Sequence, residues 1–470
     1  MIVVDMPDSY RNERSYVLDF IMNQVLGVDY EVVFRTNDSV PVVRIILPNN
    51  CTLQLDDILF QTPEKEWLAS HVIPESPLPT VLVEDKISAL LSDSELPIMF
   101  AGAEMNRHGR PWKRNSDSGI KINFDLLGAV FFMLTRYEEV AAPTFDYHDR
   151  YNSKHSLAVR NCFDMRPLAD EYIALLRFFV LQLDPSVKIK SQYYSVELSH
   201  DLDRPYRFGS LSGYLKVFLG HILKRRSIGL TAEWLRQGVR RIRGREFDCF
   251  FVGLQTLLEI SERHGLRSQI NIMGAEGGLH DEGYDPAAIP LRETLKSAEA
   301  RGHIIGFHPG YHTYNDPKRF AEERKRVEEG LGVQITRVRQ HYLRMKVPST
   351  WRMWYENQIM EDGSLGFPDR NGFRAGTSHA YTLFDLENHC ELHVRETPLI
   401  VMDGALKAGF NESLGPDQAI VKANRLADLC KKYGGTFSLL WHNSSFNGDW
   451  AGWEKVYESI VKHSVELLDD

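Results

Sequence analysis

The stretch Tyr193-Tyr-Ser-Val-Glu-Leu-Ser-His-Asp-Leu-Asp-Arg-Pro205 is the most informative part of the sequence for the fold class. Its aromatic, β-branched and apolar residues up to Leu198 predict a strand, and Pro205 stops this strand soon afterwards. If strand geometry persists, Asp201 and Asp203 point to the same face, because alternate residues of a strand share a face. One carboxylate could then ligate a metal while the other acts as a base. The alternative is a turn with polar caps or surface ion pairs.

Further strand-and-helix units follow this stretch along the chain. Segments with apolar residues at helical spacing alternate with short segments of β character. The expected helices are residues 251–264, 291–301 and 317–331, and the expected strands are residues 193–198, 267–273, 303–307 and 436–441. Repeated units of this kind predict a parallel sheet or barrel with its chemistry at the C-terminal ends of the strands.

The first 188 residues have a different pattern. They predict a mixed α/β domain with helices at residues 16–26 and 126–139 and a strand at residues 42–47. This part holds only four of the 17 histidines and no cluster with metal-ligand spacing. We therefore expect a smaller N-terminal domain over residues 1–188, structural or substrate-covering, and a domain that carries the chemistry over residues 189–470.

Composition excludes several classes of protein. The 470 residues carry 55 Lys and Arg against 64 Asp and Glu, a net charge of −9, and 43% are hydrophobic. This is globular composition, and its acidic balance argues against a nucleic-acid-binding protein. Five cysteines without a CxxC pair favour a reducing compartment over a disulfide scaffold. Because we find no signal-peptide pattern and no apolar run of about 18 residues, we expect a cytoplasmic protein.

Residues 213–246 are a local exception to the acidic balance. Between residues 216 and 245 the chain has nine Lys and Arg against the single acid Glu233, with apolar residues at helical spacing. A pair of amphipathic basic helices suits an anionic membrane surface or a lipid-linked phosphorylated sugar. The alternative is a helical insertion packed on the barrel with a solvated basic face. The first interpretation predicts peripheral contact with the inner face of the membrane.

Two histidines follow the expected strand at residues 303–307. In His308-Pro-Gly-Tyr-His312 the imidazoles are four residues apart, which places both on one face of a helical turn and grips a divalent metal. Pro309 stands where H-E-x-x-H proteases carry their glutamate base, so that class is excluded. With one carboxylate of the Asp pair, these imidazoles would form a site that leaves room for water and substrate. The alternative is a pair of histidines with purely structural roles.

Two further segments offer groups for a hydrolysis reaction. Arg339-Gln-His-Tyr342 follows a short strand-like segment. Its guanidinium could orient a catalytic carboxylate, and a backbone N–H of the following turn could face an oxyanion. His442 ends the last expected strand and could protonate a leaving group. Arg339 could equally belong to a basic loop, and His442 could be a satisfied polar group.

Taken in this order, the four motifs resemble those of the polysaccharide deacetylase family, carbohydrate esterase family 4. That family carries an Asp pair, H-[ST]-x-x-H, R-x-P-Y and L-x-x-H, and the resemblance covers roughly residues 191–470. It implies a distorted (β/α) barrel and a divalent metal, usually zinc. The implied roles are base for Asp201, metal ligands for Asp203, His308 and His312, orientation of the base for Arg339, oxyanion-hole N–H for Tyr342 and general acid for His442. The two Asp are adjacent in most members and separated here, so their roles are interchangeable.

Other segments extend the resemblance. Residues 131–139, 372–376 and 398–403 resemble a bacterial branch of deacetylase-like proteins with an uncharacterised N-terminal domain, often linked to surface-polysaccharide synthesis. Asp403 is the candidate for the family's aspartate that tunes the acid histidine. Arg374 could bind a carboxylate or phosphate of the substrate, or it could be an ion-pair partner. The candidate substrate-binding residues are Arg374, Trp441 and Asp403.

Together these features predict a zinc-dependent hydrolase that removes an N-acyl group, expected to be acetyl, from an amino sugar. The expected substrate is a nucleotide-linked or lipid-linked glycan in surface-polysaccharide biosynthesis. Because the metal chemistry does not select the acyl group, hydrolysis of a formamide or a cyclic imide is the alternative among enzymes. A non-catalytic glycan-binding or scaffold protein that kept the barrel is the alternative from another class.

Overall fold

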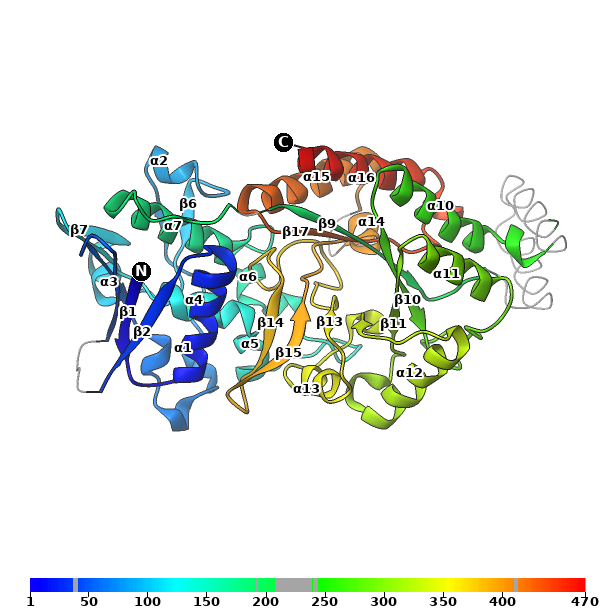
Figure 1. Ribbon diagram of the computed structural model, residues 1–470, viewed down its shortest axis with the longest axis horizontal. Coiled ribbons are helices and arrows are strands. Elements are labelled where there is room, and N and C mark those ends of the chain that lie inside the picture. The colour runs from blue at the N-terminus through cyan, green and yellow to red at the C-terminus, as the bar shows by residue number, and fades with distance from the viewer. Residues whose placement is uncertain (37–40, 192, 208–238, 240–243, 410–412, 470) are drawn as a thin grey trace. The chain divides into compact units, whose positions relative to one another are not determined.

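The computed structural model describes residues 1–36, 41–191, 193–207, 239, 244–409 and 413–469 (Figure 1). The chain divides into two units. Unit 1 comprises Met1–Ser195, Leu343–Ile400 and Arg425–Phe437, and unit 2 comprises Val196–Tyr342, Val401–Asn424 and Ser438–Asp470. The first boundary lies close to the expected one after residue 188, but the two later segments of unit 1 were expected in the second domain. Most of the expected basic insertion at residues 213–246 lies outside the described residues.

Unit 1 is built on a six-stranded mixed sheet. In pairing order its strands are β2 (Tyr30–Arg35), β1 (Ile2–Pro7), β3 (Val42–Ile46), β4 (Thr52–Asp56), β8 (Gly119–Ile122) and β7 (Trp112–Ser116). β1 pairs in parallel with β2 and antiparallel with β3, and β4 pairs in parallel with β8. Buried and part-exposed residues alternate along β1 and β4, as they do when one face of a sheet packs on a core.

The helices of unit 1 differ from the expected ones at their ends. The helix expected at residues 16–26 starts earlier, as α1 (Arg11–Leu18), and continues as a π-helix (Asp19–Val25). The helix expected at residues 126–139 is two helices, α4 (Leu126–Leu134) and α5 (Tyr137–Ala141), because Arg136 between them has a left-handed backbone with φ 55°. The remaining helices are α2 (Asp85–Ser88), α3 (Ala103–His108), α6 (Leu157–Arg160), α7 (Leu168–Leu183) and α13 (Ser349–Glu356).

Smaller strands complete unit 1. They are β5 (Thr80–Leu82), β6 (Glu95–Pro97), β13 (Glu361–Asp362), β14 (Tyr381–Asp385) and β15 (Cys390–Glu396). β5 and β6 form an antiparallel pair, and β15 pairs in parallel with β13 and antiparallel with β14.

Unit 2 contains the parallel sheet that the sequence predicts. In pairing order its strands are β12 (Arg337–Val338), β11 (Ile304–His308), β10 (Ser268–Met273), β9 (Ser195–Leu202), β17 (Thr436–Leu440) and β16 (Val401–Met402). β9, β10, β11 and β12 pair in parallel, as do β16 and β17. The expected strands are therefore confirmed to within a few residues, whereas closure into a barrel remains a prediction.

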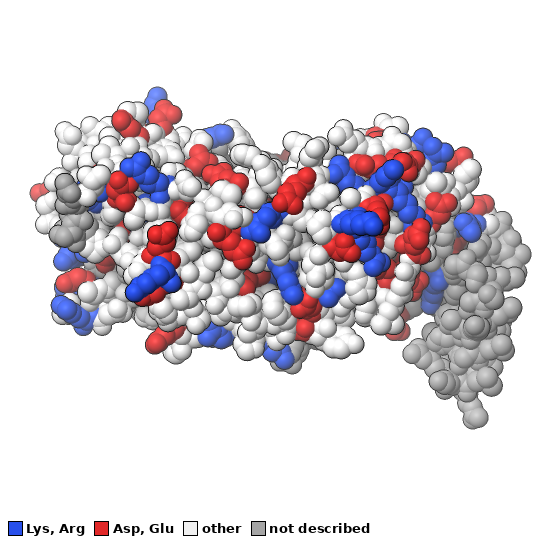
Figure 2. All heavy atoms as spheres, turned by 90° about the horizontal axis from the view of Figure 1, so that it is seen from below, with Lys and Arg blue, Asp and Glu red and all other residues white. Residues whose placement is uncertain are grey.

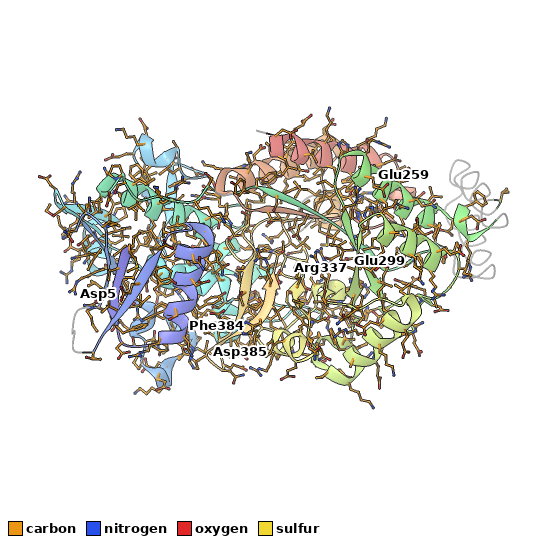
Figure 3. All side chains as sticks on the ribbon, in the orientation of Figure 1. Asp5, Glu259, Glu299, Arg337, Phe384 and Asp385 are labelled. Atoms are coloured by element: carbon orange, nitrogen blue, oxygen red, sulfur yellow. The ribbon has the colours of Figure 1, made fainter. Side chains whose placement is uncertain are left out.

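Helices follow the strands of unit 2 in the predicted alternation. They are α10 (Cys249–Arg263), α11 (Leu291–Ala300), α12 (Pro317–Leu331), α14 (Asp403–Ala408) and α16 (Trp453–Asp469), while α15 (Pro416–Tyr433) runs from unit 2 into unit 1. Each of α10 and α11 buries one face and exposes the other, on which Glu259 and Glu299 lie (Figure 3). Because only one face of each helix is buried, apolar residues recur in the sequence at helical spacing, and the helices could be predicted from it.

The surface is mixed in charge. Acidic and basic side chains are interspersed on the face that Figure 2 shows. In the described part of the chain, no helix combines the length and the apolar character needed to cross a bilayer.

Candidate metal centre

Asp203, His308 and His341 form a cluster at the C-terminal ends of three strands of unit 2. Asp203 directly follows β9, His308 is the last residue of β11, and His341 begins a 3₁₀ turn shortly after β12. One possible ligand atom from each residue lies within 4.8 Å of the other two. His308 Nε2 is 3.1 Å from Asp203 Oδ1, and His341 Nε2 is 3.5 Å from the same oxygen. Both imidazoles are buried and the Asp203 side chain is 36% exposed, so solvent reaches the cluster beside Asp203.

Hydrogen bonds at Nδ1 orient both imidazoles. His308 Nδ1 is 2.6 Å from the backbone oxygen of Arg339, and a carbonyl oxygen can only accept. His341 Nδ1 is 2.9 Å from Asp281 Oδ1, which also accepts the backbone N–H of Tyr311 at 2.8 Å. Both Nδ1 atoms therefore carry hydrogen, and Nε2 is left as the ligand atom that faces Asp203.

This donor set fits a divalent metal. A carboxylate and two imidazoles, each with an Nδ1 partner, are the ligands that catalytic zinc sites use. The electrostatics agree with a site for positive charge. Burial opposes the charged form of Asp203, but His341 and His308 outweigh it and hold the pKa of this carboxyl well below its usual range. Burial likewise opposes a charged His308, but Asp201 and Asp203 raise its pKa.

His312, the expected third ligand, is exposed and stands outside the cluster. The prediction relied on a helical turn, because only a helix places residues four apart on one face. Residues 309–312 instead form an irregular segment and a turn, and the His312 ring lies 5.0 Å from that of Tyr311. His341 occupies the third position. Its signal in the sequence was an imidazole within the third motif, shortly after the strand that neighbours β11.

Asp201 lies beside the cluster and is held by two side chains. Its Oδ1 accepts a hydrogen bond from Asn271 Nδ2 at 2.7 Å, and Arg339 Nε is 3.8 Å from the same oxygen. All three residues are buried. Gly306 makes room for this arrangement, because a Cβ there would lie 2.2 Å from Asn271 Oδ1. Asn271 was not among the residues predicted from the sequence, and its signal there was an amide between the two isoleucines of a largely apolar strand.

His442 and Asp403 form a pair on the other side of Asp203. His442 follows β17, and Asp403 follows the adjacent parallel strand β16. Asp403 Oδ1 is 2.8 Å from His442 Nδ1, and Oδ2 accepts the backbone N–H of His442 at 2.9 Å. His442 Nε2 is 3.8 Å from Asp203 Oδ2. Burial opposes a charged imidazole, but Asp403 reverses this effect and raises the pKa of His442 to about 10. Asp403 therefore holds the histidine, and this role differs from substrate binding.

Tyr342 has a strained backbone directly after His341. Its φ of 62° and ψ of 8° lie in the left-handed region, which a non-glycine residue enters at a cost of about 1–3 kcal/mol. The ring contacts those of His280, Tyr311 and His341. The N–H expected to line an oxyanion hole belongs to this strained turn, at the edge of the cluster.

Arg374 and Trp441 are buried away from solvent. In unit 1, Arg374 is 3% exposed and forms a two-point ion pair with Glu139, with N–O distances of 2.7 and 3.0 Å. Of the two roles considered for Arg374, substrate binding and an ion pair, the structure shows the ion pair. In unit 2, Trp441 is fully buried, with its ring 5.2 Å from that of Tyr457. The burial of both side chains gives no support to their expected contact with a substrate.

Comparison with known proteins gives a family of unknown function for the N-terminal part. Residues 2–185 match the model of this family, DUF7033. No curated protein matches the sequence. Three solved structures described as polysaccharide deacetylases are similar to part of the chain. They come from Mycobacterium smegmatis (16% identity, TM-score 0.37, 58% of this chain and 85% of that chain), Pseudomonas aeruginosa PAO1 (13%, 0.36, 58% and 84%) and Bacillus cereus, protein Bc1974 (10%, 0.25, 57% and 85%).

Proposed function

We propose that this protein is a divalent-metal-dependent hydrolase that removes an N-acyl group, expected to be acetyl, from an amino sugar of a surface-polysaccharide precursor. One observation carries the proposal. The Nε2 atoms of His308, His341 and His442 approach the carboxylate of Asp203 at 3.1 to 3.8 Å, with a second carboxylate, Asp201, beside them. The motif resemblance described above supplies the substrate class.

Asp203, His308 and His341 are the residues that would hold the metal, with zinc the expected ion. When bound, the metal supplies a Lewis acid for the acyl carbonyl and for the attacking water. The tautomers fixed by the Arg339 carbonyl and by Asp281 present the two Nε2 atoms without any rearrangement. Because the two imidazoles are already oriented, little side-chain entropy would be lost when the metal binds, and this favours tight metal binding.

Asp201 is placed to take a proton from the attacking water. Its Oδ2 is 3.9 Å from His308 Nδ1, so its carboxylate borders the cluster without being one of its ligands. Asn271 and Arg339 hold it on the Oδ1 side. A base fixed in this way keeps one orientation, which general base catalysis requires.

His442 is placed to give a proton to the leaving amine. Asp403 engages Nδ1, so Nε2 is the atom that faces the cluster. The water oxygen bonds to the acyl carbon, the C–N bond breaks, and the amine leaves with the proton from His442. The backbone N–H of Tyr342 would donate to the carbonyl oxygen as it gains charge. The products are the free acid and the amino sugar.

The test combines metal analysis of the full chain with an acetate-release assay over N-acetylated nucleotide sugars and lipid-linked glycans. Asp201→Asn should keep the metal and lower the rate about 100- to 10,000-fold, the usual contribution of a positioned base. His308→Ala should lose both metal and activity. Asp117→Asn, at an exposed carboxylate in unit 1, is the matched control and should match the wild type.

Three results would contradict the proposal. They are a fully active metal-free protein, an Asp201→Asn variant with wild-type rate, and the absence of acid release from every substrate tested. Release of formate in place of acetate would assign the same site to a different acyl group.

A further inference from the structure

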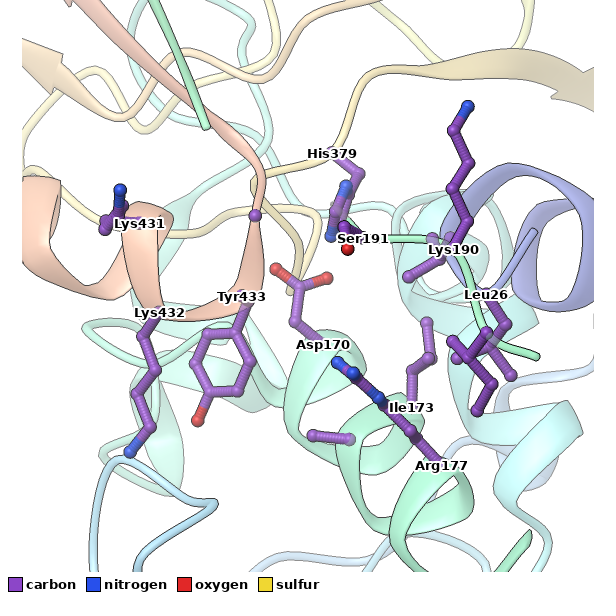
Figure 4. A pocket seen from close by; sticks show the side chains of 14 residues that line it. Leu26, Asp170, Ile173, Arg177, Lys190, Ser191, His379, Lys431, Lys432 and Tyr433 are labelled. Atoms are coloured by element: carbon purple, nitrogen blue, oxygen red, sulfur yellow. The ribbon is translucent and has the colours of Figure 1, made fainter. Parts of the chain in front are cut away.

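Figure 4 shows a cavity of unit 1 on which the lysine ammonium groups do not converge. Those of Lys190, Lys431 and Lys432 extend to different sides. Asp170, which also lines this cavity, accepts the N–H and the hydroxyl of Ser378 at 2.9 and 3.1 Å. Another cavity of unit 1 differs, because a buried carboxylate in its wall has an oxygen without a partner.

Three segments of unit 1 line this other cavity. The first is the start of α1 with the residues before it, the second runs through the 3₁₀ turns Leu59–Gln61 and Glu64–Glu66, and the third is the turn between β14 and β15. The lining residues are Ser9, Tyr10, Glu13, Phe60, Gln61, Thr62, Glu64 and His389. The volume is about 500 Å³, within the range of about 300–1,000 Å³ for small-molecule pockets.

Hydrogen bonds tie the three segments together. Tyr10 Oη donates to the carbonyl oxygen of Thr62 at 2.7 Å, and the side chain of Asn12 donates to the carbonyl oxygen of His389 at 2.8 Å. Tyr10 and His389 both have a left-handed backbone, with φ of 49° and 53°, a strained conformation that clusters at ligand-binding sites. The walls of the cavity are therefore fixed before a ligand arrives, which lowers the entropic cost of binding.

Glu13 places a buried negative charge in the wall. It is 2% exposed, and its Oε1 accepts a hydrogen bond from His389 Nδ1. Its second oxygen, Oε2, has no hydrogen-bond partner among the described residues. A buried carboxylate is costly unless its oxygens are paired, and buried polar atoms nearly always have partners. A donor supplied from the cavity would complete Glu13.

Glu64 adds a second negative charge. It is exposed and forms no ion pair among the described residues. Burial, and then the charges of Glu13 and Glu64, raise the pKa of Tyr10 to about 12, so both carboxylates act at the same phenol. The described lining contains no Lys or Arg, and a protonated His389 offsets only one of the two charges. The field in the cavity therefore favours a cation.

We propose that this cavity binds a small organic molecule through a primary ammonium group. An ammonium carries three donors and a positive charge, so it can pair with Glu13 Oε2 and offset the charge of Glu64. A neutral hydroxyl supplies a donor without the charge, and an anion would be repelled by both carboxylates. Tyr10 and Phe60 give the wall apolar surface for the body of the ligand, and the volume limits it to the size of a small metabolite.

The test is calorimetric titration of the full chain at pH 7 and low salt with two pairs of probes. Benzylamine is compared with benzyl alcohol, and glucosamine with glucose, because an ammonium replaces a hydroxyl within each pair. The amine of at least one pair should bind saturably and at least about 10-fold more tightly than its neutral partner. The pair with the tighter amine shows whether the body of the ligand is aromatic or a sugar.

Two variants test the carboxylates. Glu13→Gln should weaken the tighter amine at least about 10-fold, because it removes a buried charge. Glu64→Gln should weaken it about 3-fold, because solvent screens an exposed carboxylate. Glu66→Gln is the matched control and should bind like the wild type, since Glu66 belongs to the same 3₁₀ turn as Glu64 and lies outside the lining.

The proposal fails if neither amine binds more tightly than its neutral partner, or if both glutamate variants bind the amine like the wild type. A melting temperature checks the fold of Glu13→Gln, and Glu64→Gln, at an exposed side chain, decides the question if that fold is lost. His308→Ala should bind the amine normally, so failure of the hydrolase proposal leaves this one standing. Loss of amine binding in His308→Ala would place the amine at the metal centre and overturn the proposal.

Discussion

Lowering the pH from 8 to 5 is expected to cost this protein about 2 kcal/mol of folding free energy through one residue, His200. His200 is 1% exposed in β9, with Nδ1 2.9 Å from the carbonyl oxygen of Trp441 and Nε2 3.0 Å from Ser268 Oγ. The carbonyl can only accept, so Nδ1 carries the hydrogen and Nε2 accepts from the hydroxyl. This geometry satisfies the neutral imidazole completely.

The magnitude follows from the pKa. Burial is the largest effect and lowers the pKa of His200 from 6.5 to about 4. Because the folded-state pKa lies below the unfolded one, the neutral form contributes stability that is fully present above pH 6.5 and is lost as the pH falls to 4. The gap corresponds to about 3 kcal/mol when titration is complete, and to about 2 kcal/mol at pH 5.

Urea unfolding at pH 8 and pH 5 measures this effect. The difference in free energy of unfolding between the two pH values should be about 2 kcal/mol smaller for His200→Gln than for the wild type. His71→Gln removes an imidazole whose side chain is 65% exposed and should leave the difference unchanged. The reasoning is refuted if His200→Gln has the same pH dependence as the wild type.

Three further predictions concern the residue that orients His341, a close helix contact next to His442, and the buried ion pair of Arg374. Asp281→Asn removes the charge that orients His341 and should weaken metal binding about 10- to 100-fold in a chelator competition, while unchanged affinity would show that the carboxylate is dispensable. Gly253→Ala places a Cβ 2.1 Å from the backbone oxygen of Asn443 and should cost about 1–3 kcal/mol in urea unfolding and lower kcat, since His442 is the preceding residue. Arg374→Met removes one of the two guanidinium partners of the buried Glu139, which keeps Arg136, and should cost about 1–3 kcal/mol without changing KM, whereas a raised KM would indicate contact with the substrate.

The elements of unit 2 could be predicted because burial there follows a simple period. α10, α11 and α12 each bury one stripe, β10 and β11 are short, mostly buried segments between them, and β9 ends in five buried residues. The spacing of apolar residues in the sequence therefore indicates which face of each helix or strand packs against the core.

The N-terminal helices could not be placed in the same way, because long-range contacts set their ends. The break between α4 and α5 lies at Arg136, whose guanidinium is buried and paired with Glu138 and Glu139 and donates to the carbonyl oxygen of Arg374. The apolar stripe continues across this break, so periodicity alone predicts one helix. The assignment of Leu343–Ile400 to unit 1 likewise depends on contacts between distant segments.

The candidate site was predictable where it depended on strand ends. Asp203, His308 and His442 each follow or end a strand that the sequence indicated. The structure does not bring His312 into the cluster, because the expectation required a helical turn that residues 309–312 do not form. Asp281 lies between β10 and α11 in a segment without regular structure, where no periodicity exists to place it.

The metal content of two single variants tests whether Asp203, His308 and His341 hold the metal. His341→Ala should lose stoichiometric zinc after dialysis, because it removes one of the three proposed protein ligands, whereas His312→Ala should retain zinc at the wild-type level. Elemental analysis of both purified variants gives the answer without a known substrate. Retention of zinc by His341→Ala together with its loss from His312→Ala would contradict the ligand set of Asp203, His308 and His341.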